Sequence, residues 1–273
     1  MTKSSLHTIN YLIAALAIIS CIISIFNNDI YQDGEWINAQ WLGQDIVTLG
    51  MAVPILLISI IKTSDTKNRQ WRILNSGILL YFVYTYIFYV FAAKLTFLYL
   101  FHIPIFSLAT FGFVLSCLKL HTYDCGFALP RKSLKYTIIV YLILIVLMLS
   151  FIWLGDIFAH LTNPEHRSET PDGEAPLIIY SLDLAIIIPL MCMAAFLLYK
   201  QKNWGYILTG IILAKAGTLG FALMAMSLSM YIQKLNPDYF LIILWSFIGI
   251  IGTLLTILYL KNLTLTNNTK VRK

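Results

Sequence analysis

The chain has 273 residues, of which 59% are hydrophobic and only 12% are charged, and its formal net charge is +6. Soluble domains carry roughly a quarter charged residues, so this composition excludes an ordinary soluble protein. The positive charge is distributed among separate loops rather than gathered in one patch, so we expect the lipid bilayer, and no nucleic acid, as the partner.

Apolar runs of about twenty residues recur along the whole chain, and each is long enough to cross about 30 Å of hydrocarbon. The runs are continuous rather than alternating, which indicates helices and not barrel strands. We read the first run as an uncleaved helix, because it continues past Cys21 to Phe26. We therefore expect an all-α polytopic membrane protein with spans at about 9–27, 42–61, 72–93, 95–118, 136–155, 177–199, 205–230 and 239–260.

The basic residues predict the orientation of these spans. Fifteen Lys and Arg residues lie in the loops and tails of one side, whereas the other side holds only Lys94, Arg167 and Lys234. The remaining one, Lys215, lies inside a span. Loops rich in Lys and Arg stay in the cytoplasm, so we expect both termini to be cytoplasmic in a cell inner membrane.

An internal repeat is visible in the sequence. Residues 71–80, WRILNSGILL, align without gaps on residues 204–213, WGYILTGIIL, and Pro54 upstream corresponds to Pro189. Four spans per half is an even number, so the halves would have the same orientation, as in parallel-repeat membrane proteins. We expect two parallel four-helix halves, residues 1–134 and residues 135–273, the second ending in a short basic cytoplasmic tail.

Spans two, four and six share a local pattern, in which an ionisable residue in the outer half precedes a proline. The pairs are Asp45 with Pro54, His102 with Pro104, and Asp183 with Pro189. Proline removes a backbone hydrogen bond and frees a carbonyl group, which neighbours or water must then satisfy. The pattern predicts a polar site in the outer half of the bundle, although prolines that only shape the bundle remain the alternative.

Other polar residues inside spans are candidates for the same site. Ionisable groups in a bilayer are costly and usually face a protein interior or a water-filled cavity. Asp183 and Lys215 would be a carboxylate and its counter-charge, or a structural ion pair. Tyr81 and Tyr84 lie deep in a span and need hydrogen-bond partners, which Asp45, His102 or Asp183 could provide.

The outer loop, residues 156–176, contains His160 and His166 among several acidic residues and prolines. We interpret it as a solvated, mobile loop, with metal binding as the alternative. His102 is the only histidine expected inside a span, so a bis-histidine haem is not favoured. We expect no metal and no cofactor.

Three segments together resemble a family of uncharacterised multi-pass membrane proteins of prokaryotes. They are GQDIVTL at 43–49, YFVYTYIFYVF at 81–91, and WGYIL at 204–208 with KAGTL at 215–219. The resemblance covers roughly the second to the seventh span, but residues 92–94, AAK, depart from the Gly and Phe-Asn pair expected there. It implies no activity, and it implies recurring motif positions at Gln44, Asp45, Thr48, Asp183 and Lys215.

The leading functional hypothesis is a carrier or permease-like protein for a small solute or a proton. The predicted site residues are Asp45, Asp183, Lys215, His102, Tyr81, Tyr84, Gln44, Thr48 and Thr218. A membrane-embedded enzyme that acts on a lipid-borne substrate is one alternative, and a non-catalytic sensor or assembly subunit is another. The sequence does not indicate an oligomeric state.

Overall fold

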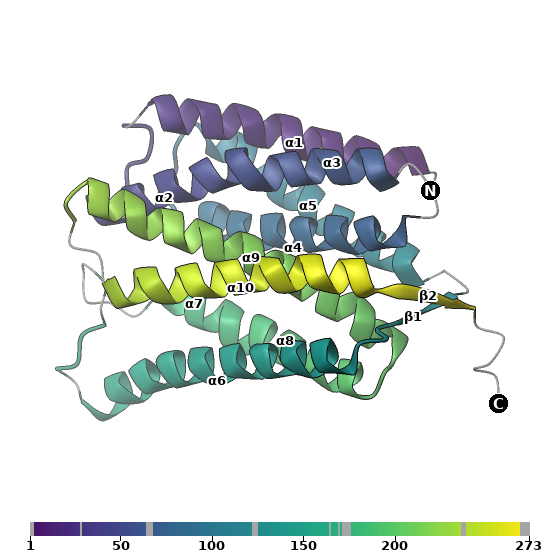
Figure 1. The fold of residues 1–273 in the computed structure, drawn as a ribbon. Helices are drawn as coiled ribbons and strands as arrows, with labels where there is room; N and C mark the ends of the chain where they lie inside the picture. The colour runs from purple at the N-terminus through teal and green to yellow at the C-terminus, as the bar shows by residue number, and fades with distance from the viewer. Residues whose placement is uncertain are drawn as a thin grey trace. The chain divides into compact units, whose positions relative to one another are not determined.

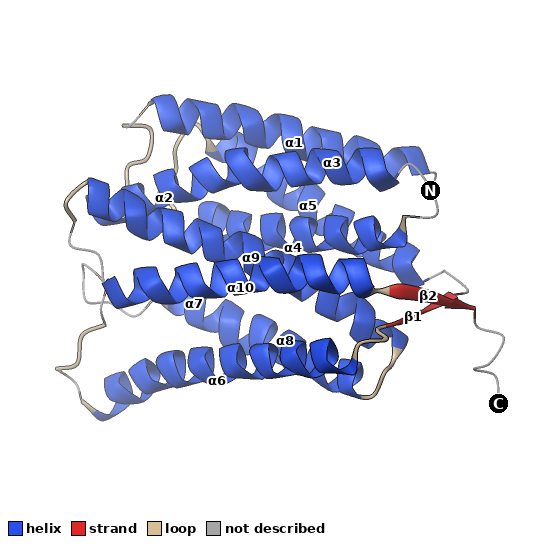
Figure 2. Ribbon diagram, viewed as in Figure 1, coloured by secondary structure: helices blue, strands red, loops and turns tan. Residues whose placement is uncertain are grey.

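The computed structural model describes residues 3–27, 29–63, 68–121, 125–163, 165–168, 170, 176–235 and 239–267. This part of the chain is almost entirely helical (Figure 2). The α-helices are α1 (Lys3–Phe26), α2 (Glu35–Val47), α3 (Val53–Thr63), α4 (Arg69–Phe91), α5 (Tyr99–His121), α6 (Lys132–Thr162), α7 (Leu177–Leu182), α8 (Ile188–Tyr199), α9 (Asn203–Ile232) and α10 (Tyr239–Asn262).

Eight helical segments among the described residues are long and apolar enough to cross a membrane. Helices α2 and α3 together form one of them, Glu35–Thr63, and α7 and α8 form another, Leu177–Tyr199. The expected all-α polytopic fold is therefore confirmed. Some boundaries differ from the prediction: α1 begins at Lys3 instead of near residue 9, and α2 begins at Glu35 instead of near residue 42. Helix α6 continues to Thr162 instead of ending near residue 155. Asp156 and His160 consequently lie on a helix and not in the outer loop.

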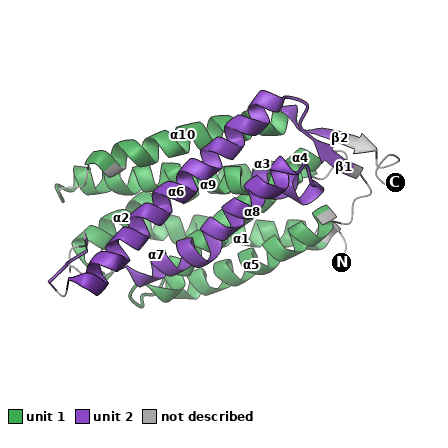
Figure 3. Ribbon diagram, turned by 90° about the horizontal axis from the view of Figure 1, so that it is seen from below, with its two compact units in different colours: residues 1–124, 210–261 green, residues 125–209, 262–273 purple. Residues whose placement is uncertain are grey.

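The chain divides into two compact units (Figure 3). Unit 1 comprises Met1–Asp124 and Gly210–Lys261, and unit 2 comprises Cys125–Thr209 and Asn262–Lys273. Helix α9 contributes its first turns to unit 2 and the rest to unit 1. These units do not coincide with the halves expected from the sequence repeat, which stays a prediction.

Helix α4 is the most buried span of unit 1. It packs along α5 and α3, and α1 in turn packs against α5 and α3 (Figure 1). Small residues let other helices of this unit approach closely, as is usual in membranes. A Cβ atom added to Gly77 of α4 would collide with Ala214 of α9, and one added to Gly43 of α2 would collide with the backbone of Ala225.

A π-helical segment precedes a proline in two of the spans. Residues Thr48–Ala52 join α2 to α3 two residues before Pro54, and Asp183–Ile187 join α7 to α8 two residues before Pro189. Proline cannot donate to the carbonyl four residues earlier, and a wider turn shifts the neighbouring hydrogen bonds by one residue. In both spans a predicted site residue, Thr48 or Asp183, begins the π-helical segment.

Unit 2 contains a short antiparallel ribbon in addition to its helices. Strand β1 (Cys125–Ala128) pairs with β2 (Thr264–Asn267), so that Ala128 lies opposite Thr264. The side chain of Asn203, at the start of α9, accepts a hydrogen bond from the backbone N–H of Phe127. Helix α6 packs along α8 in the same unit. The sequence analysis assigned only helices, so the ribbon is an addition to the expected all-α fold.

Candidate functional site

The centre of the candidate site is the carboxylate of Asp45, on α2 in unit 1. Its side chain is only 1% exposed. One oxygen, Oδ1, accepts a hydrogen bond from the hydroxyl of Tyr89 at 2.7 Å and one from the thiol of Cys21 at 3.6 Å. The other oxygen, Oδ2, accepts from Tyr31 at 2.8 Å and from the hydroxyl of Ser24. Four donors that carry no charge thus surround one buried acid.

Aromatic rings from three elements cover this carboxylate: Trp41 lies on α2, Tyr89 on α4, and Tyr31 in the segment between α1 and α2. The ring centroids of Tyr31 and Tyr89 are 6.1 Å apart, and those of Trp41 and Tyr89 are 4.8 Å apart. Asp33 fixes the segment, because it accepts a hydrogen bond from the indole of Trp41 at 2.9 Å and one from the backbone N–H of Lys94 at 3.0 Å. Burial raises the pKa of the Tyr31 phenol well above its usual value, with the charge of Asp45 as the second cause. Tyr31 therefore keeps its proton and remains a donor.

His102, on α5, lies beside the same rings. Its Nε2 atom is 3.2 Å from the hydroxyl of Ser20, and its ring centroid is 4.5 Å from that of Tyr89 and 5.6 Å from that of Tyr86. The histidine is 2% exposed. His102 therefore contacts Tyr89, which is itself a donor to Asp45, and so lies beside the group of residues around the carboxylate.

A second group of predicted residues lies at the junction of α2 and the first π-helical segment. The side-chain amide of Gln44 donates to the hydroxyl of Tyr81 at 2.5 Å, and the hydroxyls of Tyr81 and Thr48 are 3.0 Å apart. All three side chains are buried. This answers the expectation that Tyr81 needs a hydrogen-bond partner, although its partners are Gln44 and Thr48 rather than an ionisable group.

Three further predicted residues have partners elsewhere. The ammonium of Lys215 lies 3.6 Å from the centroid of the Tyr84 ring, which is a cation–π contact within unit 1. Thr218 donates to the backbone carbonyl of Ala214 on its own helix. None of these contacts involves Asp45.

Asp183 belongs to unit 2 and is 5% exposed. Its Oδ2 atom accepts a hydrogen bond from the indole of Trp153 on α6 at 3.0 Å. The Trp153 ring in turn lies 5.2 Å from the ring of Tyr180, one turn before Asp183. Asp183 thus ties the start of the second π-helical segment to α6.

The sequence analysis missed the contribution of the first helix. Ser20, Cys21 and Ser24 are all buried, and they supply partners to His102 and Asp45. A signal was present, because Ser24 lies four positions after Ser20 and three after Cys21 and therefore lies on the same face of the helix as both. Tyr31 had no such signal, since it lies outside the regular helix.

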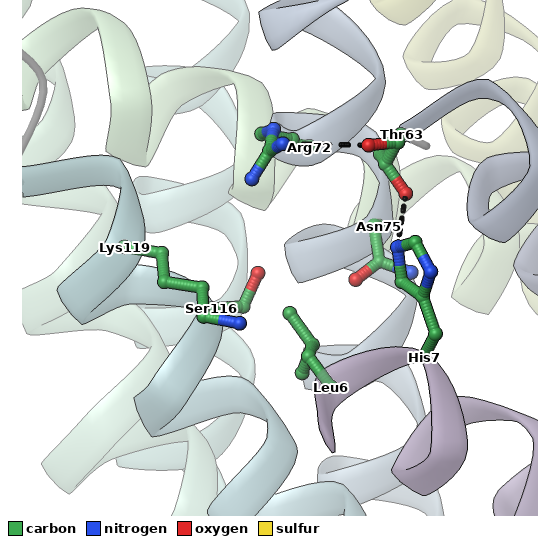
Figure 4. A pocket seen from close by; sticks show the side chains of 7 residues that line it. All are labelled: Leu6, His7, Thr63, Arg72, Asn75, Ser116 and Lys119. Atoms are coloured by element: carbon green, nitrogen blue, oxygen red, sulfur yellow. Dashed lines mark hydrogen bonds between the residues drawn. The ribbon is translucent and has the colours of Figure 1, made fainter. Parts of the chain in front are cut away.

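Two cavities are described in unit 1, and neither is a polar cavity of solute size. The polar one has a volume of about 20 Å³ and is lined by residues such as Arg72, His7 and Lys119 (Figure 4). Thr63 contacts two other residues of the lining. Its backbone carbonyl accepts a hydrogen bond from Arg72 at 3.3 Å, and its hydroxyl lies 3.3 Å from Nε2 of His7. A cavity of this size holds about one water molecule.

The second cavity, of about 230 Å³, lies among α3, α4, α9 and α10. Its walls are mostly aliphatic, with Trp71 and three threonines. Two of these, Thr218 and Thr256, direct their hydroxyls to carbonyl groups of their own helices. The cavity therefore suits a hydrocarbon chain better than a polar solute.

Comparisons of this chain with protein-family models, with curated proteins and with solved structures found no match. The resemblance to an uncharacterised family of prokaryotic membrane proteins therefore stays a prediction.

Proposed function

We propose that this multi-pass membrane protein is a carrier for protons and that Asp45 is the group that binds the proton. The observation that carries the proposal is the buried carboxylate of Asp45 with its four uncharged donors. The proposal narrows the sequence-based hypothesis of a small solute or a proton to the proton.

The hydrogen-bond count at Asp45 favours a proton over a larger solute. A carboxylate offers about four lone-pair positions, and four donors already occupy those of Asp45. A solute would have to displace at least one of these donors. A proton needs no cavity, and it needs only that one donor turn away.

Opposing effects act on the charge of Asp45. Removal from water disfavours the ionised form, whereas hydrogen bonds from Tyr89, Tyr31 and Ser24 favour it. A group on which such effects compete changes protonation state when one donor moves. This is the behaviour that a proton carrier requires.

The interior of unit 1 favours a carrier over an open channel. Asn75 of α4 bonds with Asn10 and Ser59. Tyr81 lies six residues further along α4 and bonds with Gln44 of α2. Six residues of helix span about 9 Å. Ser76 in this interval is buried and bonds with Ser116, and the buried side chains between it and Tyr81, those of Ile78, Leu79 and Leu80, are apolar. A proton could cross this layer only after a conformational change admits water.

The remaining predicted residues receive supporting roles in this proposal. Lys215, against the Tyr84 ring, would be a fixed positive charge in unit 1, and Asp183 would be a second proton-binding carboxylate in unit 2. We further propose that the protein resides in a cell inner membrane with both termini in the cytoplasm, as its basic loops predict.

Proton flux into proteoliposomes that contain a trapped pH-sensitive dye tests the proposal. A potassium gradient with valinomycin supplies the driving force. We expect flux with the wild-type protein and its loss in Asp45→Asn, because the amide cannot take up the proton. The matched control is Glu35→Gln, which removes the same charge from an exposed position at the start of the same helix. Equal proton flux in the wild-type protein and in Asp45→Asn would contradict the proposal.

A further inference from the structure

The end of α6 and the turn after it bring together three side chains that commonly bind metal ions. They are Asp156, His160 and His166, each of which offers one ligand atom, and these atoms all lie within 4.8 Å of one another. All three side chains belong to unit 2, and each is between 20% and 29% exposed. The cluster is therefore fixed by the protein and still accessible to an ion from water.

The local backbone explains why these residues meet. Asp156 and His160 are four positions apart on α6, so they lie on one face of the helix. Helix α6 ends at Thr162, and the backbone N–H of His166 then donates to the carbonyl of Asn163 at 3.0 Å. This turn directs the chain back, so that His166 contacts the helix it has just left.

The distances suit a small divalent cation. Nε2 of His166 lies 2.7 Å from Oδ1 of Asp156, and Nδ1 of His160 lies 3.8 Å from Oδ2 of Asp156. In tetrahedral zinc sites with bonds of about 2.0 Å, neighbouring ligand atoms are about 3.3 Å apart. The observed separations lie on either side of this value, so small side-chain rotations are sufficient to form the site.

The carboxylate has the supporting hydrogen bonds that ligating carboxylates usually have. The hydroxyl of Ser168 donates to Oδ2 of Asp156 at 2.6 Å, and the hydroxyl of Tyr180 donates to the same oxygen. Ser168 and Tyr180 are both buried. Such outer partners orient a ligand before the metal arrives, and their loss typically weakens metal binding 10- to 100-fold.

We propose that Asp156, His160 and His166 bind a divalent transition-metal ion of the zinc class. Two imidazoles and one carboxylate favour such an ion over Mg²⁺ or Ca²⁺, which prefer oxygen ligands. The ion takes the place of the hydrogen between Nε2 of His166 and Asp156, and the neutral imidazole then carries its hydrogen on Nδ1. Three protein ligands leave the fourth tetrahedral position to water. The proposal is independent of proton carriage by Asp45.

Zinc titration of the purified protein, after removal of any polyhistidine tag, tests this site. By calorimetry in detergent we expect saturable binding of one Zn²⁺ per chain. The double variant His160→Ala, His166→Ala should lose this binding, and Ser168→Ala should weaken it 10- to 100-fold. The matched control is His7→Ala, which removes a histidine from the polar cavity of unit 1 and should leave zinc binding unchanged.

A second measurement uses only the wild-type protein, in case the double variant does not fold. Diethyl pyrocarbonate modifies accessible imidazoles, and mass spectrometry locates the modified histidines. Zinc should protect His160 and His166 from modification while leaving His7 reactive. The proposal is overturned by an absence of saturable binding, by equal binding in the folded double variant, or by equal modification of His160 and His166 with and without zinc. Any of these results would mean that the cluster is a hydrogen-bond network that only secures the end of α6.

Discussion

The four donors around Asp45 are not equivalent, because only two of them are tyrosines anchored in a stack of rings. Tyr89 is 1% exposed, donates to Asp45 at 2.7 Å and packs against the rings of both Trp41 and His102. Its hydroxyl can be removed without removing the ring. A Tyr→Phe substitution therefore isolates the hydrogen bond from the packing.

Tyr89→Phe should destabilise the protein by about 0.6 to 2 kcal/mol, because the buried carboxylate loses a donor while the aromatic packing stays. Thermal unfolding in detergent measures the change. Tyr86→Phe is the control, since the Tyr86 ring packs against that of Tyr89 but has no described hydrogen bond to Asp45. Equal stability of wild type and Tyr89→Phe would show that the Tyr89 hydroxyl does not stabilise the site.

At the level of residues, the sequence predicted the acid and other polar residues within spans, but none of the four donors to Asp45. Gln44, Thr48 and Tyr81 form one hydrogen-bonded group, and His102 contacts Tyr89, which donates to Asp45. This was possible because polar side chains within a span must find partners inside the protein. The same argument could not choose the partners of each residue, because that choice depends on which helices are neighbours.

Close helix contacts in unit 1 depend on glycines whose positions the sequence does not reveal. Gly43 and Gly50 lie on the same span, one in α2 and one in the π-helical segment that follows it. A Cβ atom at Gly43 would come within 2.5 Å of backbone atoms of Ala225, whereas a Cβ atom at Gly50 would meet nothing within 4 Å. The two positions are therefore a matched pair.

Gly43→Ala should lower the stability of the protein by about 1 to 3 kcal/mol, because α2 and α9 must move apart to accommodate the methyl group. Gly50→Ala should leave stability unchanged or raise it by up to about 1 kcal/mol, because alanine is the better helix former. Chemical unfolding in mixed micelles compares the two variants. A larger loss in Gly50→Ala than in Gly43→Ala would contradict the described α2–α9 contact.

At the level of elements, long apolar helices were predicted well and their ends less well. The polar residues Asp156 and His160 suggested that the fifth span had ended, but α6 continues to Thr162. Asp156 has a partner in His166 beyond the helix, and His160 contacts the carbonyl of Asp156 one turn earlier. The β1–β2 ribbon was missed for another reason. Its two strands are four residues long and lie far apart in the chain, so neither has a local pattern that indicates its partner.

At the level of the whole molecule, composition alone was sufficient for the fold class. Eight segments of the described chain meet the length and hydropathy that a membrane crossing requires. Composition could not predict the division into compact units, because that division depends on packing between spans. Unit 1 includes most of α9 and of α10, although both helices belong to the second half of the sequence.

The proposed orientation can be tested with single cysteines in a background where the native cysteines are replaced by serine. Lys94 and Lys202 are both exposed, and the distribution of basic loops predicts that they lie on opposite sides of the membrane. A membrane-impermeant maleimide added to intact cells should label Lys94→Cys and not Lys202→Cys, because basic loops remain in the cytoplasm. Labelling of both positions after lysis is the control. The reverse pattern in intact cells would place both termini outside.

Infrared difference spectroscopy of the reconstituted protein tests most directly whether Asp45 takes up a proton. Proton binding by this buried acid predicts a carboxylic C=O band that grows as the pH is lowered. The band should be absent in Asp45→Asn and present in Glu35→Gln, whose substituted residue is exposed. A pH-dependent band of equal size in Asp45→Asn, or the lack of any such band in the wild-type protein, would contradict the role assigned to Asp45.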